Sequence, residues 1–423
     1  MKILVVGGGG REHAIIKSLL KSDKVEKIYA LPGNGGIALD AECYPIKATE
    51  IDKIVEFATQ KKVDYVVVAP DDPLVLGCVD KLEEKGISCF GPKKCAAIIE
   101  GSKVFSKNLM KKYGIPTGDS VTFTDPDKAI EYLKTTDYPT VIKADGLALG
   151  KGVIIAQNYN EAETAVKDVM LDKVFGASGN SILIEEFLTG PEVSVLSFTD
   201  GKVVIPMVSS MDHKRAKDGD EGLNTGGMGT VAPNPYYTEE VAKECMEKIF
   251  IPTIEAMNKE GRTFKGCLYF GLMLTSKGPK VIEYNCRFGD PETQVVLPLL
   301  ESDLLEIMMA TSKGELKPEM VKWKDGAATC VVMASNGYPQ KYESGFEIKI
   351  GNLSADENVF VAGAKLDGNV LKTAGGRVLG AVATAKTLKD AVEKAYGVVD
   401  KISFENAYYR KDIGKRALSR LEK

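Results

Sequence analysis

The sequence predicts a multidomain α/β protein, and three observations support that prediction. The chain has 423 residues, which is too long for one ordinary hydrophobic core and indicates about two to four domains. Up to about residue 100, short apolar runs alternate with helical patterns, as is typical of an open parallel sheet. Further along, segments 138–155 and 281–294 place glycines and charged side chains beside predicted strands.

The amino-terminal region predicts a Rossmann-like sheet. Apolar runs predict strands at 2–6, 26–31, 63–69 and 87–90, and helical periodicity predicts helices at 11–20, 51–62 and 73–85. Ligands of such sheets bind beyond the carboxyl ends of the strands, where the loops 7–10, 32–36 and 70–73 lie. The first loop offers backbone N–H groups to an anion, which makes Gly9 and Gly10 candidates for substrate binding. Asn34, in the second loop, is a further candidate.

The same loops argue against a nicotinamide cofactor. After Gly7 and Gly9, the third glycine of a dinucleotide fingerprint should stand at position 12, which is Glu12. The second strand leads into Pro-Gly-Asn rather than an acidic residue for a ribose hydroxyl pair. We therefore expect a different ligand at this edge.

Segment 138–155 predicts a strand, a glycine loop and a second strand. Lys143 closes the first strand, and Gly150, Lys151 and Gly152 lie in the loop. Glycines let backbone N–H groups approach a polyphosphate, and the lysines supply positive charge. The pattern is not a P-loop, because it lacks the GK[ST] sequence and no helix follows at once. Strand 119–123 and helices 126–134 and 160–170 complete a small predicted unit.

The apolar run 181–193 predicts a contact with a nucleotide base. It passes through Glu185, Glu186, Phe187 and Leu188 before a Gly-Pro pair. Such a segment can offer backbone groups to an adenine edge, and Glu192 can accept from ribose hydroxyls.

Val281–Arg287 predicts a strand with a chemical face. Alternation places Ile282, Tyr284 and Cys286 in a core and Glu283, Asn285 and Arg287 on the other face. Carboxylate and amide oxygens suit Mg²⁺, and an arginine beside them suits a phosphoryl group. A merely solvated face is the alternative.

Longer strings give a resemblance that covers essentially the whole chain. They are GGGGREHA (7–14), PGN (32–34), EGSK (100–103), IKADGLALGKGV (142–153), DHKR (212–215), NTGGMG (224–229), NCRFGDPETQ (285–294), GGRVL (375–379) and RKDIG (410–414). In this order they resemble the phosphoribosylamine–glycine ligase family of the ATP-grasp superfamily. The resemblance implies a Rossmann-like substrate domain at 1–100, an ATP-grasp domain at 101–313 with a lid at about 119–187, and a mixed α/β domain at 325–423.

The resemblance also implies an activity and its residues. ATP would phosphorylate glycine to glycyl phosphate, and the amine of 5-phosphoribosylamine would displace phosphate. Mg²⁺ or Mn²⁺ would be held by Glu283 and Asn285, with Arg287 facing the acyl phosphate and Lys103 reaching the nucleotide. The wall of the substrate site would comprise Asp212, Lys214, Arg215, Thr225, Gly226 and Gly227, with Asp290 nearby. Lys214 and Asp212 join Arg287 as catalytic candidates, and Asp212 is the candidate partner of the glycine ammonium group.

One position departs from the wider superfamily. Many ATP-grasp enzymes carry a second carboxylate on the strand before Glu283, where this chain has Gly271. Either a second metal has fewer protein ligands, or Asp290 or Glu292 contributes. On composition alone, a disordered surface loop is the default for the segment 211–230, although loops this long in compact domains are often functional.

Composition limits the partners. The net charge of −4 gives no general attraction for nucleic acid or membranes. The eight cysteines are scattered without a C-x-x-C pair, and the first residues lack a signal-peptide core. We therefore expect a cytoplasmic protein with small-molecule substrates, either a monomer or a weak homo-oligomer.

Two alternatives to the glycine-activating ligase remain. One is another purine-pathway ATP-grasp enzyme that activates formate or bicarbonate, and the other is a non-catalytic nucleotide-binding module. The GGGGREHA and RFGDPETQ strings favour the glycine enzyme. The presence of Lys143, Glu283, Asn285 and Arg287 together argues against a degenerate module.

Overall fold

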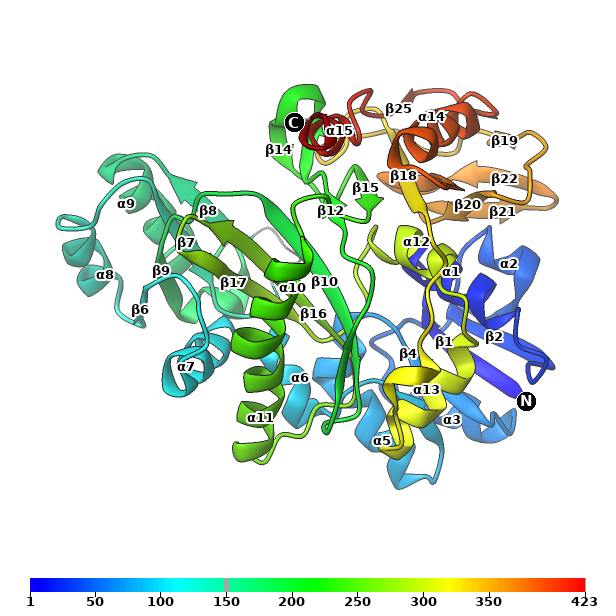
Figure 1. The fold of residues 1–423 in the computed structure, drawn as a ribbon, viewed down its shortest axis with the longest axis horizontal. Coiled ribbons are helices and arrows are strands. Elements are labelled where there is room, and N and C mark those ends of the chain that lie inside the picture. The colour runs from blue at the N-terminus through cyan, green and yellow to red at the C-terminus, as the bar shows by residue number, and fades with distance from the viewer. Residues whose placement is uncertain (148–151, 423) are drawn as a thin grey trace.

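The computed structural model describes residues 1–147 and 152–422, which form four separate main sheets (Figure 1). The first sheet is entirely parallel, in the order β3-β2-β1-β4-β5. Its strands are β1 (Lys2–Gly7), β2 (Lys27–Pro32), β3 (Glu42–Cys43), β4 (Tyr65–Val68) and β5 (Ser88–Phe90). Its helices are α1 (Gly10–Leu19), α2 (Ile37–Asp40), α3 (Ile51–Gln60), α4 (Asp71–Leu76) and α5 (Cys78–Glu84). The predicted open parallel sheet is confirmed.

One predicted helix of this region is two helices. The apolar pattern over 73–85 predicts one helix, but α4 ends and α5 begins at Gly77, which has φ +89°. That left-handed conformation suits glycine because it has no Cβ to clash with the backbone.

A small antiparallel sheet forms the unit at the far side of the molecule (teal in Figure 1). Its order is β6-β9-β7-β8, and α8 and α9 pack together with buried alanines between them. The elements are α6 (Lys94–Gly101), α7 (Lys103–Tyr113), β6 (Ser120–Phe123), α8 (Pro126–Leu133), β7 (Thr140–Ala144), β8 (Val153–Ala156), α9 (Tyr159–Met170) and β9 (Ile182–Glu186). Helices α6 and α7 connect it to the parallel sheet.

A central antiparallel sheet, in the order β11-β10-β16-β17, carries the predicted metal strand. Its strands are β10 (Glu192–Thr199), β11 (Val204–Pro206), β16 (Gly266–Thr275) and β17 (Gly278–Asn285). The helices of this region are α10 (Glu239–Cys245), a π-helical turn (Met246–Phe250), α11 (Ile251–Lys259), α12 (Thr293–Val296) and α13 (Leu304–Lys313).

A β-bulge corrects the predicted alternation of β17. Leu272 pairs with Val281 and Gly271 pairs with Glu283, so one extra residue, Ile282, lies between the two pairs. Val281 and Tyr284 are therefore buried, whereas Ile282 is only half-buried. The prediction that Ile282 enters the core was wrong, because a bulge interrupts the period of two.

The carboxyl-terminal sheet recruits strands from the middle of the chain. Its order is β12-β15-β18-β23-β20, and β25 also pairs with β18. The strands are β12 (Met211–Asp212), β15 (Gly229–Ala232), β18 (Ala327–Ser335), β20 (Glu357–Val361), β23 (Arg377–Ala385) and β25 (Ala407–Tyr408). Because β12 and β15 belong to this sheet, the segment 211–230 is not the disordered surface loop that its composition favours by default.

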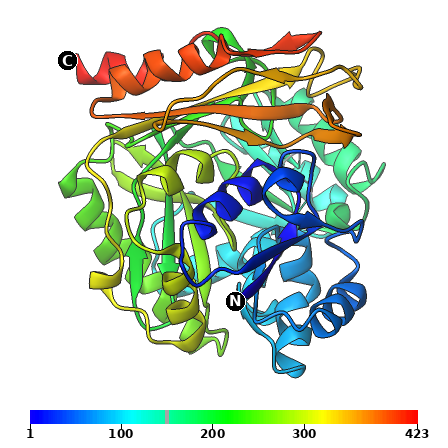
Figure 2. The same cartoon turned by 90° about the vertical axis from the view of Figure 1, so that its right-hand side faces the viewer.

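Short hairpins and two helices complete the carboxyl-terminal region, which lies across one end of the molecule in Figure 2. The remaining strand pairs are β13 (Arg215–Lys217) with β14 (Glu221–Asn224), β19 (Lys349–Ile350) with β24 (Ile402–Ser403), and β21 (Ala364–Asp367) with β22 (Val370–Thr373). The helices are α14 (Leu388–Val399), which packs on β18 and β23, and α15 (Lys415–Leu421). Within the described ranges, no helix is both long and apolar enough to cross a membrane.

Candidate functional site

Glu283 lies at the centre of a group of cations. It stands on β17 opposite Gly271, where an added Cβ would lie 3.0 Å from Glu283 Cγ. Within residues 1–147 and 152–422, its carboxylate has neither a hydrogen bond nor an ion pair within 4.0 Å. Burial alone would raise the pKa of Glu283, but four cations lower it overall: Lys214, Lys143, Lys103 and Arg287. The structure therefore holds a charged carboxylate with its oxygens free.

Arg287 and Asn285 lie beside that carboxylate. Arg287 Nη2 donates to Asn285 Oδ1 at 3.2 Å, and its Nη1 donates to the carbonyl of Phe288 at 3.4 Å. The buried Arg287 Nε has no partner in the described structure. A free carboxylate and an amide oxygen fit a divalent cation with oxygen ligands, and the unpartnered N–H fits an anionic group.

Gly271 supplies no carboxylate, so Asp290 and Glu292 are the candidates for a further metal ligand. Glu292 Oε1 accepts from Tyr269 at 3.1 Å and from Ser194 at 3.3 Å. Asp290 pairs with Arg377 at 3.3 Å and accepts from Gln294 at 2.8 Å. Both acidic side chains therefore have protein partners of their own.

Two buried lysines and one glutamate line the adjoining side of the site. Glu185 Oε2 lies 2.9 Å from Lys143 Nζ and 3.4 Å from Lys107 Nζ. Burial lowers the pKa of Lys107 to about 8, although Glu185 opposes that shift. Glu185 Oε1 is buried and has no partner in the part of the chain that the structure describes. A buried acceptor without a donor is costly, so this atom is available to a ligand.

Lys103 and the glycine loop lie on the same side of the site as Lys143 and Glu185. Lys103 Nζ donates to the carbonyl of Gly146 at 2.6 Å, and the Gly152 carbonyl accepts from Ala144 N at 2.8 Å. Burial lowers the pKa of Lys103. Gly150 and Lys151, predicted to bind phosphates, lie outside the described residues.

The acidic residues of the predicted base-binding segment 181–193 have partners in two different places. Glu186 is exposed and pairs with Lys280 at 3.0 Å, and Phe187 and Leu188 follow the end of β9. Glu192, predicted to bind ribose hydroxyls, pairs with Lys214 at 2.8 Å. Coulombic attraction to Glu192 is the main reason why the pKa of Lys214 lies above its ordinary value.

Several residues predicted for the substrate wall lie close to Asp212 or to one another in the structure. An added Cβ at Gly227, which has φ +110°, would lie 2.7 Å from Asp212 Oδ1. Thr225 Oγ1 donates to the Lys214 carbonyl at 2.9 Å, and Gly227 N donates to Thr225 Oγ1 at 3.0 Å. Burial and the neighbouring Glu292 raise the pKa of Asp212. The Arg215 side chain turns along its own hairpin and donates to the Gly222 carbonyl at 2.8 Å.

The amino-terminal loops meet this wall. An added Cβ at Gly9 would lie 3.2 Å from Asp290 Oδ2, which places the two residues side by side. Gly9 N already donates to Glu12 Oε2 at 2.6 Å, so an internal carboxylate occupies part of the predicted anion site. At Gly10, an added Cβ would lie 2.7 Å from Gln294 Nε2.

Asn34 connects two regions through its amide group. Its Nδ2 donates to the Gly8 carbonyl at 3.0 Å and to the Val361 carbonyl at 2.8 Å, and its Oδ1 accepts from Gly36 N and Ile37 N. The structure therefore places this predicted substrate ligand in a network that holds the loop to β20.

Family models match three successive parts of the chain. They are the phosphoribosylglycinamide synthetase N domain at residues 1–100, its ATP-grasp (A) domain at 101–293 and its C domain at 328–416. The chain belongs to the phosphoribosylglycinamide synthetase family. Curated relatives named phosphoribosylamine–glycine ligase include one from Caldanaerobacter subterraneus subsp. tengcongensis and one from Clostridium acetobutylicum. The first is 51% identical over 98% of this chain and 99% of the relative, and the second is 49% identical over 98% and 100%.

Solved structures agree with this membership of the phosphoribosylglycinamide synthetase family. The phosphoribosylamine–glycine ligase of Thermotoga maritima is 35% identical, with a TM-score of 0.86, over 98% of this chain and all of that chain. The biotin carboxylase domain of the Hydrogenobacter thermophilus 2-oxoglutarate carboxylase shares the fold. Its TM-score is 0.75 at 17% identity, and the match covers 96% of this chain and 91% of that one. The recognised family and the multidomain α/β fold are thus confirmed.

Sequence reasoning missed three charged residues of the site, which are the buried Glu100 and Lys107 and the half-buried Arg377. Arg377 Nη1 donates to the carbonyls of Asp290 at 2.9 Å and Gly226 at 2.6 Å. Glu100 and Arg377 stand inside the family-like strings EGSK and GGRVL, so a signal was present. Lys107 lies one helical turn beyond Lys103 on α7, and only that spacing could have indicated it.

Proposed function

We propose that this chain is an ATP-dependent ligase that joins glycine to 5-phosphoribosylamine. The products are glycinamide ribonucleotide, ADP and phosphate, in de novo purine biosynthesis. Family membership supports the activity. The observation that carries the proposal is the free Glu283 carboxylate, which lies among Lys103, Lys143, Lys214 and Arg287.

The chemistry makes a poor electrophile reactive. A carboxylate oxygen of glycine takes the γ-phosphoryl group from ATP, the bond to the bridging oxygen breaks, and ADP leaves. The amine nitrogen of phosphoribosylamine then attacks the acyl carbon of glycyl phosphate. The bond between that carbon and the phosphate oxygen breaks, and the nitrogen loses a proton as the amide forms. Both steps need positioning and charge neutralisation rather than a covalent nucleophile.

On the nucleotide side, cations and backbone groups have the main roles. Lys103 and Lys143 would neutralise the phosphates, and the loop with Gly150, Lys151 and Gly152 would cover them. Segment 185–188 would receive the adenine, and Glu192 would stand at the ribose. Because Glu192 also pairs with Lys214, it would connect the nucleotide with the substrate wall.

Glu283 and Asn285 would hold a divalent cation, Mg²⁺ or Mn²⁺. When bound, it would share the negative charge of the transferring phosphoryl group. Arg287 has an unpartnered Nε with which to donate to the acyl phosphate.

On the acceptor side, the wall at 212–227 would receive glycine and phosphoribosylamine. Asp212 would accept from the glycine ammonium group, and a bound cation would reverse the effect of burial on its pKa. Lys214, Arg215, Thr225, Gly226 and Gly227 would line the wall. Gly9, Gly10, Asn34 and Asp290 would close it from the amino-terminal loops.

The domain division belongs to the same proposal. A substrate domain at 1–100, an ATP-grasp domain at 101–313 with a lid at 119–187, and a domain at 325–423 would enclose the site. The lid would keep water from the acyl phosphate. We further propose that the protein acts in the cytoplasm on small molecules only, as a monomer or weak homo-oligomer.

One assay tests the activity. Purified protein with ATP, Mg²⁺, glycine and freshly made phosphoribosylamine should release ADP and phosphate together with one amide product. Omitting any component should abolish the product. Equal turnover with formate or bicarbonate in place of glycine would assign the chain to a different purine-pathway step. No ATP turnover with any of these acids would favour a non-catalytic module.

A further inference from the structure

We term the segment 212–228 the substrate hairpin. One of its faces lies in the proposed acceptor site, and the other faces away from that site. In the proposed acceptor site, Asp212 lies beside Gly227 and Lys214 pairs with Glu192. His213, between them, points the opposite way because side chains alternate along extended backbone. Its Nδ1 donates to the Gly229 carbonyl at 3.0 Å, and its Nε2 accepts from Gly414 N at 3.2 Å. The far side of the hairpin therefore contacts the carboxyl-terminal end of the chain.

Residues 408–414, which we term the strap, run along that far side. Tyr408 OH donates to the Ala216 carbonyl at 2.8 Å, and Lys411 N donates to Asp218 Oδ1 at 2.8 Å. Gly219 N donates to Asp412 Oδ2 at 2.8 Å. An added Cβ at Gly229 would lie 2.7 Å from Ile413 Cδ1, so the strap is also in close apolar contact. These bonds connect segments about 190 positions apart.

Arg410 is the central residue of these contacts. It is 1% exposed, and its Nη1 donates to Asp220 Oδ1 at 2.8 Å and to the Arg215 carbonyl at 3.1 Å. Its Nε and Nη2 donate to the two oxygens of Asp412, each at 2.8 Å. A planar guanidinium can bind a carboxylate with two parallel bonds and still bond elsewhere, which a lysine cannot do.

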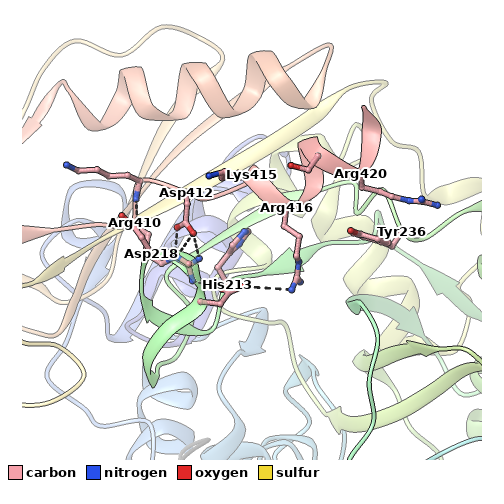
Figure 3. Close-up of a pocket in the computed structure, with 12 residues that line it drawn as sticks. His213, Asp218, Tyr236, Arg410, Asp412, Lys415, Arg416 and Arg420 are labelled. Atoms are coloured by element: carbon pink, nitrogen blue, oxygen red, sulfur yellow. Dashed lines mark hydrogen bonds and ion pairs between the residues drawn. The ribbon is translucent and has the colours of Figure 1, made fainter. Parts of the chain in front are cut away.

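The surrounding cavity contains another arginine, Arg416, that can be compared with Arg410. Figure 3 shows Arg410 and Asp412 beside Asp218, with Arg416 and Arg420 on the side of α15. The cavity of about 850 Å³ is lined by all three arginines. Arg416 is 46% exposed and lies 3.9 Å from Asp220 Oδ2, so it has one weak contact with the hairpin where Arg410 has a buried network.

We propose that Arg410 is a positioning residue. It keeps the side chains of Lys214 and Asp212 in place for the binding and reaction of glycine and phosphoribosylamine. The inference rests on the proposed function and assigns a role to the carboxyl-terminal strap. The guanidinium fixes the Arg215 carbonyl, one residue from Lys214, and Asp220 at the far end of the same hairpin. The strap touches no nucleotide-side residue in the contacts above, and Lys214 reaches that side only through Glu192. The effect of the strap should therefore be larger for glycine and phosphoribosylamine than for ATP.

Kinetics of three variants test this role. Arg410→Ala should lower kcat/KM for phosphoribosylamine by about 10- to 100-fold, because small misplacements of reacting groups have effects of that size. Arg410→Lys should recover part of the loss, since it keeps one charge but not the fork. The dissociation constant of ATP, measured by calorimetry, should change much less in both. Arg416→Ala should behave as wild type throughout.

Hydrogen exchange supplies a readout that does not depend on activity. In Arg410→Ala, amides of residues 213–228 should exchange faster, while those of β16 and β17 should not change. Wild-type kinetics for Arg410→Ala, an equal loss of ATP affinity, or an equal effect of Arg416→Ala would overturn the inference. A wild-type protein without ligase activity would instead overturn the proposed function.

A second variant covers the case in which Arg410→Ala does not fold. Tyr408→Phe removes only the hydroxyl that donates to the Ala216 carbonyl. It should lower kcat/KM for phosphoribosylamine several-fold with a smaller change in ATP affinity, and full activity of this variant would contradict the role of the strap.

Discussion

Arg287 Nη2 and Glu100 Oε1 lie 3.0 Å apart, and both side chains are largely buried. Glu100 also accepts from Cys286 N at 2.7 Å through its other oxygen. One carboxylate at the end of α6 thus orients both the guanidinium and the backbone that follows Asn285. Burial raises the pKa of Glu100, although Arg287 opposes that shift. The aim of Arg287 toward the site therefore depends on a residue that contacts no proposed substrate.

Glu100→Gln should lower kcat by roughly tenfold or more, because breaking a buried ion pair leaves the other charge unpaired. Steady-state assays with saturating ATP and glycine measure this loss. Glu84→Gln, on the exposed face of α5, is the matched control and should behave as wild type. Equal activity of the two variants would remove Glu100 from any role in orienting Arg287.

Glu283→Gln should lower turnover by about 10²-fold or more, because it removes the charge placed to balance a divalent cation. The protein should remain folded, since Gly271 opposite leaves room for an isosteric side chain. Activity assays over a Mg²⁺ titration, with Tm measured alongside, check the prediction. Near-normal turnover and an unchanged Mg²⁺ dependence would place the metal elsewhere.

Gly227→Ala should impair the acceptor site. Its φ is +110°, and the new Cβ would meet Pro291 Cδ at 2.5 Å and Asp212 Oδ1 at 2.7 Å. Backbone strain of this kind costs on the order of 1–3 kcal/mol, and the displaced Asp212 should raise KM for glycine.

Gly261→Ala separates the two effects. Gly261 also has a positive φ, +68°, but no described atom lies within 4 Å of the added Cβ. It should lose stability without any change in KM. If both variants had wild-type KM values for glycine, Asp212 would not be the ammonium partner.

His213 should make stability pH-dependent. Burial and the neighbouring Arg410 lower its pKa from 6.5 to about 4, so the folded protein keeps the ring neutral while the unfolded chain protonates it below about 6.5. Stability is therefore fully present above 6.5 and falls by up to roughly 3 kcal/mol as the pH drops toward 4. Urea unfolding of wild type and His213→Gln at pH 7 and pH 5 measures this. The stability difference between the two proteins should shrink at pH 5, and a constant difference would mean that His213 titrates normally.

Much of the fold was predictable because its signals are local. The apolar strands β1 and β4 and the helix α3 follow from runs and periodicity within about ten residues. The break at Gly77 and the bulge at Ile282 were not predictable in this way, since each depends on how neighbouring elements pack. The placement of β12 and β15 in the carboxyl-terminal sheet requires pairing with β18, about a hundred residues away along the chain.

The site shows the same division between local and distant information. Alternation along one strand correctly placed Glu283 and Asn285 on the open face. The partners of Arg287 and Asp290 come from α6 and β23, so Glu100 and Arg377 could be found only through three-dimensional proximity. Asn34 stays a predicted substrate residue, and nothing in the sequence indicated that its amide bonds to backbone groups on two sides.

The fate of the glycine oxygens tests the central claim most directly. Glycine labelled with ¹⁸O in both carboxylate oxygens, supplied with ATP, Mg²⁺ and phosphoribosylamine, should transfer one labelled oxygen to each inorganic phosphate released. The amide product should keep the other. That pattern requires a glycyl phosphate whose carbon–oxygen bond breaks when the amine attacks. Release of unlabelled phosphate, with both labelled oxygens still on unreacted glycine, would contradict the account.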